Sequence, residues 1–179
     1  SMVHGLTVPG AIEAAQRKSM PDFLYPKFVT QEGSRPRIKD DPPLIFHPTA
    51  ELAPGVESGH AEVMATYRET LPEHTRTLFD RFHLFDVAIK VVGVGSVGTM
   101  CAIGLLMAAD DDPLFLQVKE ARASVLEPYA GKSLHSNHGQ RVVVGQRIMQ
   151  TATDVFLGWT RGKNGRDVYV RQLRDIKMS

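Results

Sequence analysis

Three glycines in the pattern Gly93-x-Gly95-x-x-Gly98 follow directly on a β-rich stretch, residues 85–92. Glycine adopts positive φ readily, and without a Cβ its backbone N–H groups approach a phosphate closely. The pattern therefore predicts a strand that runs into a tight loop able to bind phosphate. A purely structural turn between two strands uses the same residues, so the loop alone leaves both interpretations open.

The segment after Gly98 limits the folds that can contain this loop. In a dinucleotide-binding βαβ unit, residues 99–109 would form the helix, residues 114–118 the second strand, and Glu120 would bind a ribose. Only 81 residues follow Gly98, and their pattern predicts one further helix and a hairpin. Because a parallel sheet needs crossover connections, an NAD-binding unit is the lesser alternative.

The small lobe of protein-kinase-like folds places such a loop between two antiparallel strands. There a lysine on the third strand contacts the nucleotide phosphates. Lys119 ends the alternating stretch 114–119, and residues 136–152 have the composition of a helix. Two apolar runs then flank an Asn164-Gly165 turn, which predicts a hairpin. This order of elements favours the kinase-like lobe.

The candidate nucleotide-binding residues are the loop residues together with one lysine, namely Gly93, Gly95, Ser96, Gly98 and Lys119. The loop would bind phosphates through backbone N–H groups, Lys119 would neutralise them, and the backbone of residues 173–175 would face an adenine. Lys90 stands in a Val-Ala-Ile-Lys sequence that matches the kinase lysine motif, but it precedes the loop. We therefore assign Lys90 to the first strand and prefer Lys119.

The predicted fold is α+β, a five-stranded antiparallel sheet with one packed helix. The strands are expected at residues 84–93, 98–108, 114–120, 155–160 and 166–174. The apolar face of the helix is expected to consist of Val142, Val143, Ile148 and Met149. We expect residues 83–179 to form this domain and residues 1–82 a helical, proline-rich region, together one compact domain.

Within the N-terminal region, residues 8–20 predict a short helix and residues 21–56 a proline-rich arm. Residues 43–46 could form a short edge strand, because prolines flank them. Residues 57–82 predict two helical pieces with a break at residues 71–73. Their expected buried positions are Val63, Tyr67, Leu78, Phe79 and Phe82.

Composition restricts the class of protein. The chain has 179 residues, a net charge of +1 and 23% charged residues, which is ordinary globular composition with no overall argument for nucleic-acid binding. Its longest apolar stretch is too short to cross a bilayer, and no signal peptide opens the sequence. With Cys101 as the single cysteine, an intramolecular disulfide is excluded. We expect a cytoplasmic protein with no membrane contact.

Charge is unevenly distributed along the chain. Residues 130–179 contain nine Lys or Arg and three acids, a net charge of +6, whereas the preceding residues carry −5. One interpretation is a chance asymmetry of solvated surfaces. The other is a basic surface that meets an anionic ligand or an acidic partner.

Several blocks of the sequence resemble a bacterial family of uncharacterised proteins, domain of unknown function 2252. The resembling blocks are residues 86–98, 114–129, 137–150 and 156–175. The resemblance implies a relation to the kinase-like superfamily with a permuted order of parts. It also implies a catalytic Gly-Asp-x-His-x-x-Asn run and an Asp-x-x-Asp-Phe-Asp run before the glycine loop.

This sequence departs from that family pattern. Neither of these two runs is present, and Val144 stands where the resemblance implies a glutamate that would pair with Lys119. Glu120, Glu127 and Asp154 are the acids that remain to compensate. Phosphoryl transfer needs a base and metal-binding carboxylates, so we expect no catalytic residues and no activity of this chain alone.

The sequence therefore predicts a truncated or split kinase-like lobe that binds ATP with Mg²⁺ and is phosphotransferase-like only within a larger assembly. The alternative is a non-catalytic interaction module, which would form a homodimer or bind a separate catalytic lobe through exposed apolar surface. Two weaker motifs are interpreted structurally. His135-x-x-His138 predicts a helix start rather than a metal site, and residues 110–112 predict a solvated turn.

Overall fold

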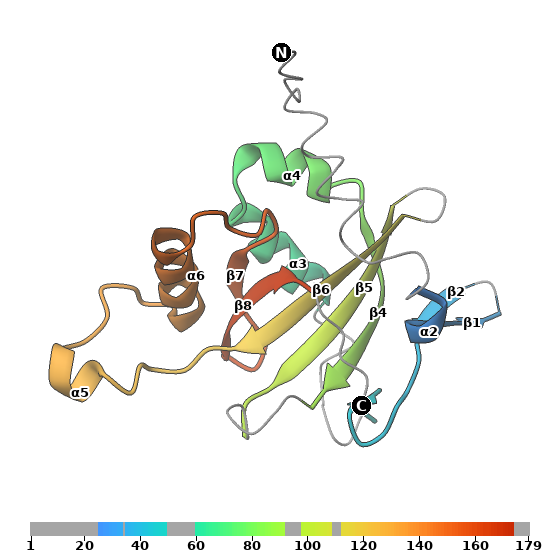
Figure 1. Cartoon of the computed structure of the whole chain (residues 1–179), viewed down its shortest axis with the longest axis horizontal. Helices are drawn as coiled ribbons and strands as arrows, with labels where there is room; N and C mark the ends of the chain where they lie inside the picture. Colours follow the sequence, from blue (N-terminus) through green and yellow to red (C-terminus); the bar gives the residue numbers. More distant parts are fainter. Residues whose placement is uncertain (1–24, 34, 50–59, 92–97, 109–111, 174–179) are drawn as a thin grey trace, which may run out of the picture.

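The computed structural model contains a six-stranded antiparallel sheet with helices on both sides (Figure 1). The structure describes residues 25–33, 35–49, 60–91, 98–108 and 112–173. In chain order its elements are α2 (Tyr25–Phe28), β1 (Val29–Glu32), β2 (Arg35–Ile38), β3 (Ile45–Phe46), α3 (His60–Glu69), α4 (Glu73–Phe79), β4 (His83–Lys90), β5 (Cys101–Ala108), β6 (Asp112–Glu120), α5 (Glu127–Ala130), α6 (His138–Met149), β7 (Gly158–Arg161) and β8 (Asp167–Gln172). The predicted α+β class is confirmed.

The strands of the sheet follow the order β3-β4-β5-β6-β8-β7. All five predicted strands are present, but the predicted number of five is wrong, because β3 adds a sixth strand at the edge beside β4. Ile45 lies opposite Lys90 and Phe46 opposite Ile89. The edge position of residues 43–46 is thus confirmed. A two-residue strand is too short to show which strand it will join, so only its packing decided that.

A second, two-stranded sheet lies in the proline-rich arm, where the sequence predicted no pairing. β1 and β2 pair from Val29 with Ile38 to Glu32 with Arg35. Together with α2, they cover one end of the main sheet. The buried apolar cluster at this contact consists of Phe28, Val29, Ile38, Ile45, Ala88, Ile103, Leu105, Met107, Phe115 and Leu173.

Polar contacts anchor this arm to β4. Asp86 accepts a hydrogen bond from the backbone N–H of Ile38 at 2.7 Å. His47 bridges two carboxylates, with Nδ1 2.7 Å from Asp40 Oδ1 and Nε2 2.9 Å from Asp86 Oδ2. Asp86 therefore ties both β2 and the segment after β3 to the main sheet.

Helices α3 and α4 pack on the opposite face of the sheet. The two helices and the break between them confirm the prediction for residues 57–82. Tyr67 is fully buried, and its hydroxyl donates a hydrogen bond to the Phe156 carbonyl at 2.5 Å. The second apolar cluster comprises Tyr67, Leu71, Phe79, Phe82, Leu106, Ala108, Leu114, Leu116, Phe156 and Val170.

Helix α6 packs against β7 and β8 mainly through its first half. A Cβ at Gly139 would overlap the carbonyl oxygen of Val168, so glycine permits this close approach. Val143 is fully buried, but Ile148 is 77% and Met149 85% exposed. The predicted apolar face is therefore wrong at its C-terminal end, where Ile148 and Met149 point to solvent while Arg147 contacts Trp159.

The hairpin of β7 and β8 confirms the Asn-Gly turn signal. Gly165 has φ +75°, and the Gly162 N–H donates to the Arg166 carbonyl at 2.8 Å. Trp159 lies opposite Tyr169, and the Arg147 guanidinium stands 5.9 Å from the centre of the Trp159 ring. The predicted helix over residues 8–20 lies outside the described residues.

The segment from residue 99 to 109 decides against the dinucleotide-binding alternative. That fold needs a helix immediately after the glycine loop. Cys101–Ala108 is instead the fully buried strand β5, paired antiparallel with β4 and β6. Antiparallel neighbours at this position leave no βαβ unit.

Candidate functional site

Lys119 lies on one face of the sheet at the end where β4 and β5 are joined. In an antiparallel pair, directly opposed residues point to the same face. Lys119 is opposed by Cys101 on one side and by Tyr169 on the other, and Gln117 is opposed by Arg171. These side chains therefore share one face and gather at one end of it.

Lys90 of β4 joins the same group. It follows Ile89, which lies opposite Ala102, so the next pair along these strands brings Lys90 to Cys101. Both lysines are half-buried and Arg171 is exposed. We call Lys90, Lys119 and Arg171 the basic cluster. The sequence interpretation placed Lys90 on the first strand correctly but did not bring it together with Lys119.

A buried polar pair lies beneath the basic cluster. Cys101 is 2% and Gln117 4% exposed. The Gln117 amide nitrogen donates to Cys101 Sγ at 3.4 Å, and the Arg171 Nε donates to the Gln117 amide oxygen at 3.2 Å. Gln117 thereby holds the Arg171 guanidinium against the sheet.

Burial shifts the pKa of two groups in this region, and nearby charges modify each shift. Burial raises the pKa of the Cys101 thiol, and the nearby Lys119 and Lys90 only partly oppose that effect. The thiol is therefore neutral at physiological pH, as expected of a core cysteine and not of a nucleophile. Burial also lowers the pKa of Lys90, and the positive charge of Lys119 lowers it further.

The carboxylates that could have balanced Lys119 are engaged elsewhere. Glu120 accepts from the Met100 N–H at 2.9 Å and pairs with Arg122 at 2.7 Å. Asp154 accepts from two backbone N–H groups, and Glu127 faces Ser124. Helix α6 carries no acid. Within the described ranges, no ion pair therefore includes Lys90 or Lys119.

The glycine loop enters β5 beside the basic cluster. Gly98 has φ +81°, a conformation that favours glycine, and its carbonyl accepts a hydrogen bond from Arg122. The Glu120 N–H donates to the Met100 carbonyl at 2.9 Å. The end of the loop is thus fastened to the end of β6, next to Lys119. Gly93, Gly95 and Ser96 lie outside the described residues.

Of the predicted adenine contact at residues 173–175, the structure describes only Leu173. Leu173 is 3% exposed, and its N–H donates to the Phe115 carbonyl at 2.9 Å. This N–H therefore belongs to the sheet and is not offered to a ligand. Residues 174 and 175 lie outside the described residues.

Comparison with known proteins identifies the family. The chain matches, over residues 6–179, the family described as "Uncharacterized protein conserved in bacteria (DUF2252)". It belongs to the DUF2252 family. No curated protein and no solved structure matches the chain. The resemblance noted in the sequence is confirmed, while the kinase-like relation and the truncation stay predictions.

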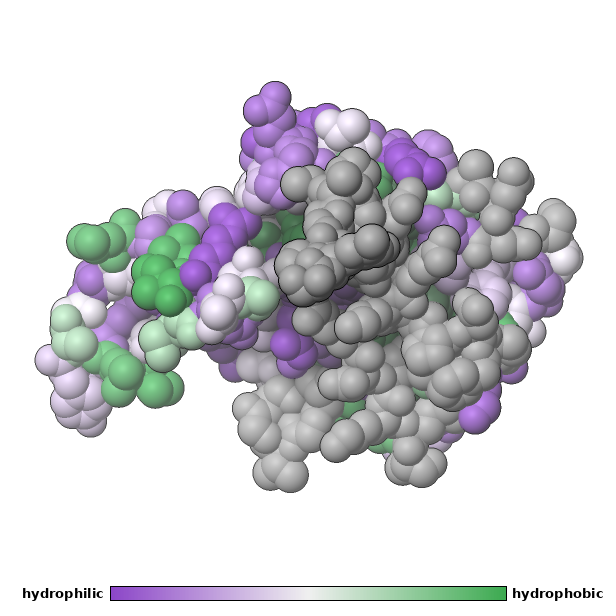
Figure 2. Space-filling view, turned by 45° about the horizontal axis from the view of Figure 1, so that its top comes forward, coloured by the Kyte–Doolittle hydropathy of each residue, from purple (hydrophilic) through white to green (hydrophobic). Residues whose placement is uncertain are grey.

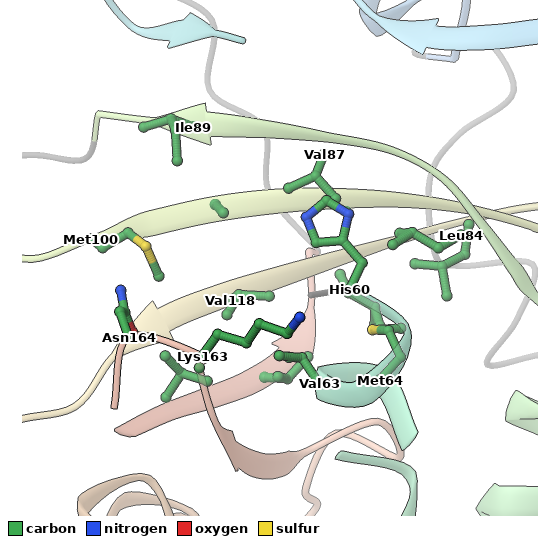
Figure 3. Close-up of a pocket in the computed structure, with 17 residues that line it drawn as sticks. His60, Val63, Met64, Leu84, Val87, Ile89, Met100, Val118, Lys163 and Asn164 are labelled. Atoms are coloured by element: carbon green, nitrogen blue, oxygen red, sulfur yellow. The ribbon is translucent and has the colours of Figure 1, made fainter. Parts of the chain in front are cut away.

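The opposite face of this DUF2252 sheet has an apolar groove that sequence reasoning missed. Figure 3 shows it between α3, the sheet and the 162–164 turn, with the Lys163 side chain lying along it. Its volume is about 160 Å³. Most of the lining is aliphatic, from Val63, Met64, Leu84, Val87, Ile89, Ala102, Leu106, Leu116, Val118, Val168 and Val170. Such a lining favours apolar contact, and His60, Lys163 and Asn164 add polar side chains to it.

Three arginines form ion pairs with two carboxylates near the start of α6. Arg122 and Arg166 contact Glu120, whereas Arg161 pairs with Asp167 at 2.7 Å. Asp167 also accepts from the His138 N–H, which supports the interpretation of His138 as a helix start.

Asp112, predicted in a turn, begins β6 instead. In the part of the chain that the structure describes, no group of three His, Cys, Asp or Glu side chains has a metal-binding arrangement.

One further finding concerns membranes. Among the helices in the described ranges, none has both the length and the apolar character that crossing a bilayer requires.

Proposed function

We propose that this DUF2252 chain is a kinase-like nucleotide-binding lobe that does not catalyse phosphoryl transfer by itself. The observation that carries the proposal is the position of Lys119. It lies on the third strand of the β4-β5-β6 meander, at the end where the glycine loop joins the first two strands. Helix α6 and the β7–β8 hairpin follow in the order that the kinase-like lobe requires.

In this proposal both the glycine loop and Lys119 bind the phosphates, each in a different way. Gly93, Gly95, Ser96 and Gly98 bind them through backbone N–H groups, as the sequence pattern predicts. Lys119 supplies positive charge from the floor of the site. Since no described carboxylate pairs with it, its charge is available for an anion.

The residues of the site suit the phosphates better than a metal ion. In kinase-like proteins Mg²⁺ neutralises charge on the phosphates and is held by carboxylates. Glu120, which follows Lys119, accepts from the Met100 N–H and pairs with Arg122, and Asp154 accepts from the Gln172 N–H. These acids are therefore not available as the general base that would accept a proton from the phosphate acceptor. Catalysis would therefore need groups from another lobe.

Thermal unfolding with and without ligand tests this function. ATP at about a hundredfold excess over its dissociation constant stabilises a binding-competent fold by about 2.7 kcal/mol. We expect this shift with ATP, its loss in Lys119→Ala, and its retention in Lys132→Ala, an exposed control lysine. A wild-type chain that shows no shift with ATP would refute the proposal. A shift with NADH alone would refute it too.

A second candidate function, an interaction module, is favoured by exposed apolar side chains. Val125, Leu126, Tyr129 and Leu134 lie on the segment around α5, and Leu134 is fully exposed. In Figure 2 apolar residues gather at the end of the molecule where α5 and the C-terminal part of α6 lie. Solvent-exposed apolar groups clustered in this way mark interfaces.

Light scattering separates the two candidates. As an interaction module the chain would be a stable dimer, and Leu126→Asp with Tyr129→Asp would return it to a monomer. A monomeric wild type that binds ATP would favour the nucleotide-binding lobe. The matched control is Lys132→Asp, which changes charge on an exposed position of the same segment.

A further inference from the structure

The basic cluster contains two cations that the nucleotide-binding proposal does not use. Lys90, Lys119 and Arg171 come from three different strands, yet each lies near enough to the buried Cys101 to oppose the rise of its thiol pKa. Neighbouring strands lie about 4.8 Å apart, so β4 and β6 are separated by about 10 Å across β5. The Lys90 and Lys119 side chains are long enough to meet over that gap, and Arg171 lies on β8, the neighbour of β6, opposite Gln117.

The basic cluster differs from the arginines near the start of α6, because no carboxylate of the described residues pairs with it. Near the start of α6, Arg122, Arg161 and Arg166 each contact a carboxylate. In the basic cluster, the described residues provide only the neutral Gln117 as a hydrogen-bond partner, to Arg171. Three like charges, two of them half-buried, thus lie on the same end of one sheet face, which costs free energy in the unliganded fold.

Half-burial makes this arrangement more costly than a solvated lysine patch. Lys90 and Lys119 are both half-buried, so water screens their mutual repulsion less than it would on an open surface. The lowered pKa of Lys90 agrees with that repulsion, after the larger effect of burial. Such cost is typical of a site whose charges are matched only when a ligand is bound.

We propose that Lys90, Lys119 and Arg171 together bind a triphosphate group as the bare polyanion, without a metal ion held by this chain. This inference rests on the proposed nucleotide-binding function and names the part of the ligand that the site recognises. A singly charged anion would leave two of the three cations unmatched, whereas a triphosphate offers several charged oxygens along its length. The triphosphate belongs either to a nucleotide or to inorganic polyphosphate.

Two variants test the inference through their effects on stability and binding. Lys90→Met and Arg171→Met keep most of the side-chain length and remove the charge. We expect Lys90→Met to unfold at a higher temperature than the wild type without ligand, because repulsion is relieved. Arg171→Met also loses the hydrogen bond to the buried Gln117, so only its binding is compared. We also expect each variant to lose at least half of the thermal shift that sodium tripolyphosphate or ATP produces in EDTA. Lys132→Met is the control, with neither change expected.

The possible results distinguish failure of the triphosphate inference from failure of the nucleotide-binding function on which it rests. A wild-type shift with ATP that depends on Lys119 but is unchanged in Lys90→Met and Arg171→Met overturns the inference and leaves the function standing. A shift that appears only when Mg²⁺ is added also overturns it. No shift with either ligand refutes both. A shift with ATP and none with tripolyphosphate identifies a nucleotide as the source, and equal shifts identify the phosphate chain alone.

Discussion

The sheet face that carries Lys119 has two halves of opposite character, although the same strands build both. Along β6 the residues on this face run from Phe115 through Gln117 to Lys119, and along β4 from Ala88 to Lys90. The apolar half is covered by α2, β1 and β2, whereas the polar half lies toward the glycine loop. On this face, each strand passes from a buried apolar side chain to a charged one within two to four residues.

The apolar half of this face stabilises the fold, whereas the polar half has charged side chains that are available to bind a ligand. The apolar half buries large side chains against the arm, which contributes most of the free energy on this face. The basic cluster contributes none of that burial and adds repulsion. Removing groups from the two halves should therefore change stability in opposite directions.

The largest effect is expected from Phe115→Ala in the apolar half. Phe115 is 3% exposed within the cluster around the arm. Truncation of a buried phenylalanine costs about 3–5 kcal/mol, since it leaves a cavity. Urea denaturation of the variant beside Lys119→Met measures the contrast. Equal destabilisation by both substitutions would show that the halves do not differ as described.

The next effect concerns the anchor of the arm. Asp86→Asn removes the charge that accepts from the Ile38 N–H and pairs with His47. A part-buried hydrogen bond to a charged group is worth about 1–3 kcal/mol. We expect a loss in that range by urea denaturation, with faster amide exchange at Ile38. Asp40→Asn, at the more exposed end of the same bridge, should cost clearly less.

A pH-dependent effect is expected at the start of α6. Burial by itself would raise the pKa of Asp167, but hydrogen bonds from Arg161 and from the His138 N–H lower it below the ordinary value of 3.8. A carboxyl group with a lower pKa in the folded state stabilises the fold above its unfolded pKa. That stability is lost as the pH falls through the folded pKa.

Asp167→Asn should therefore destabilise the protein by about 1–2 kcal/mol at pH 7, and the gap to wild type should narrow below about pH 4. Urea denaturation at several pH values measures both quantities. A gap that stays constant down to pH 2.5 would show that the carboxylate charge is not what stabilises the helix start.

The smallest effect is expected at the loop end. Gly98→Ala places a Cβ on a residue with φ +81°, where nothing lies within 4 Å of it, so the cost is conformational and about 1 kcal/mol. Gly104→Ala is the matched control, because its Cβ would make ordinary contacts of 3.5 Å with Leu84. Thermal unfolding that shows Gly104→Ala as the more damaging change would contradict this account.

The order of elements could be predicted from the sequence because local patterns specify it. Alternation predicted β6, the Asn164-Gly165 turn predicted the last hairpin, and Leu71-Pro72 predicted the break between α3 and α4. Lys119 was selected by its spacing from the loop. These signals depend on side-chain periodicity and backbone preferences, which act over a few residues.

The arrangement of those elements in space was decided only by tertiary packing. β1 and β2 pair within a proline-rich arm that has no strand periodicity, because the main sheet buries Val29 and Ile38. The exposure of Ile148 and Met149 at the end of α6 was likewise decided by packing, which no helical pattern reveals.

The candidate site shows the same division. The sequence by itself determined that a lysine follows a glycine loop on a later strand and that α6 has no acid to pair with it. Tertiary structure alone brought Lys90 and Arg171 to Lys119 over Cys101, since strand pairing joins residues more than fifty positions apart. Charge clustering is a property of the assembled sheet, and cross-strand neighbours leave no trace in a linear pattern.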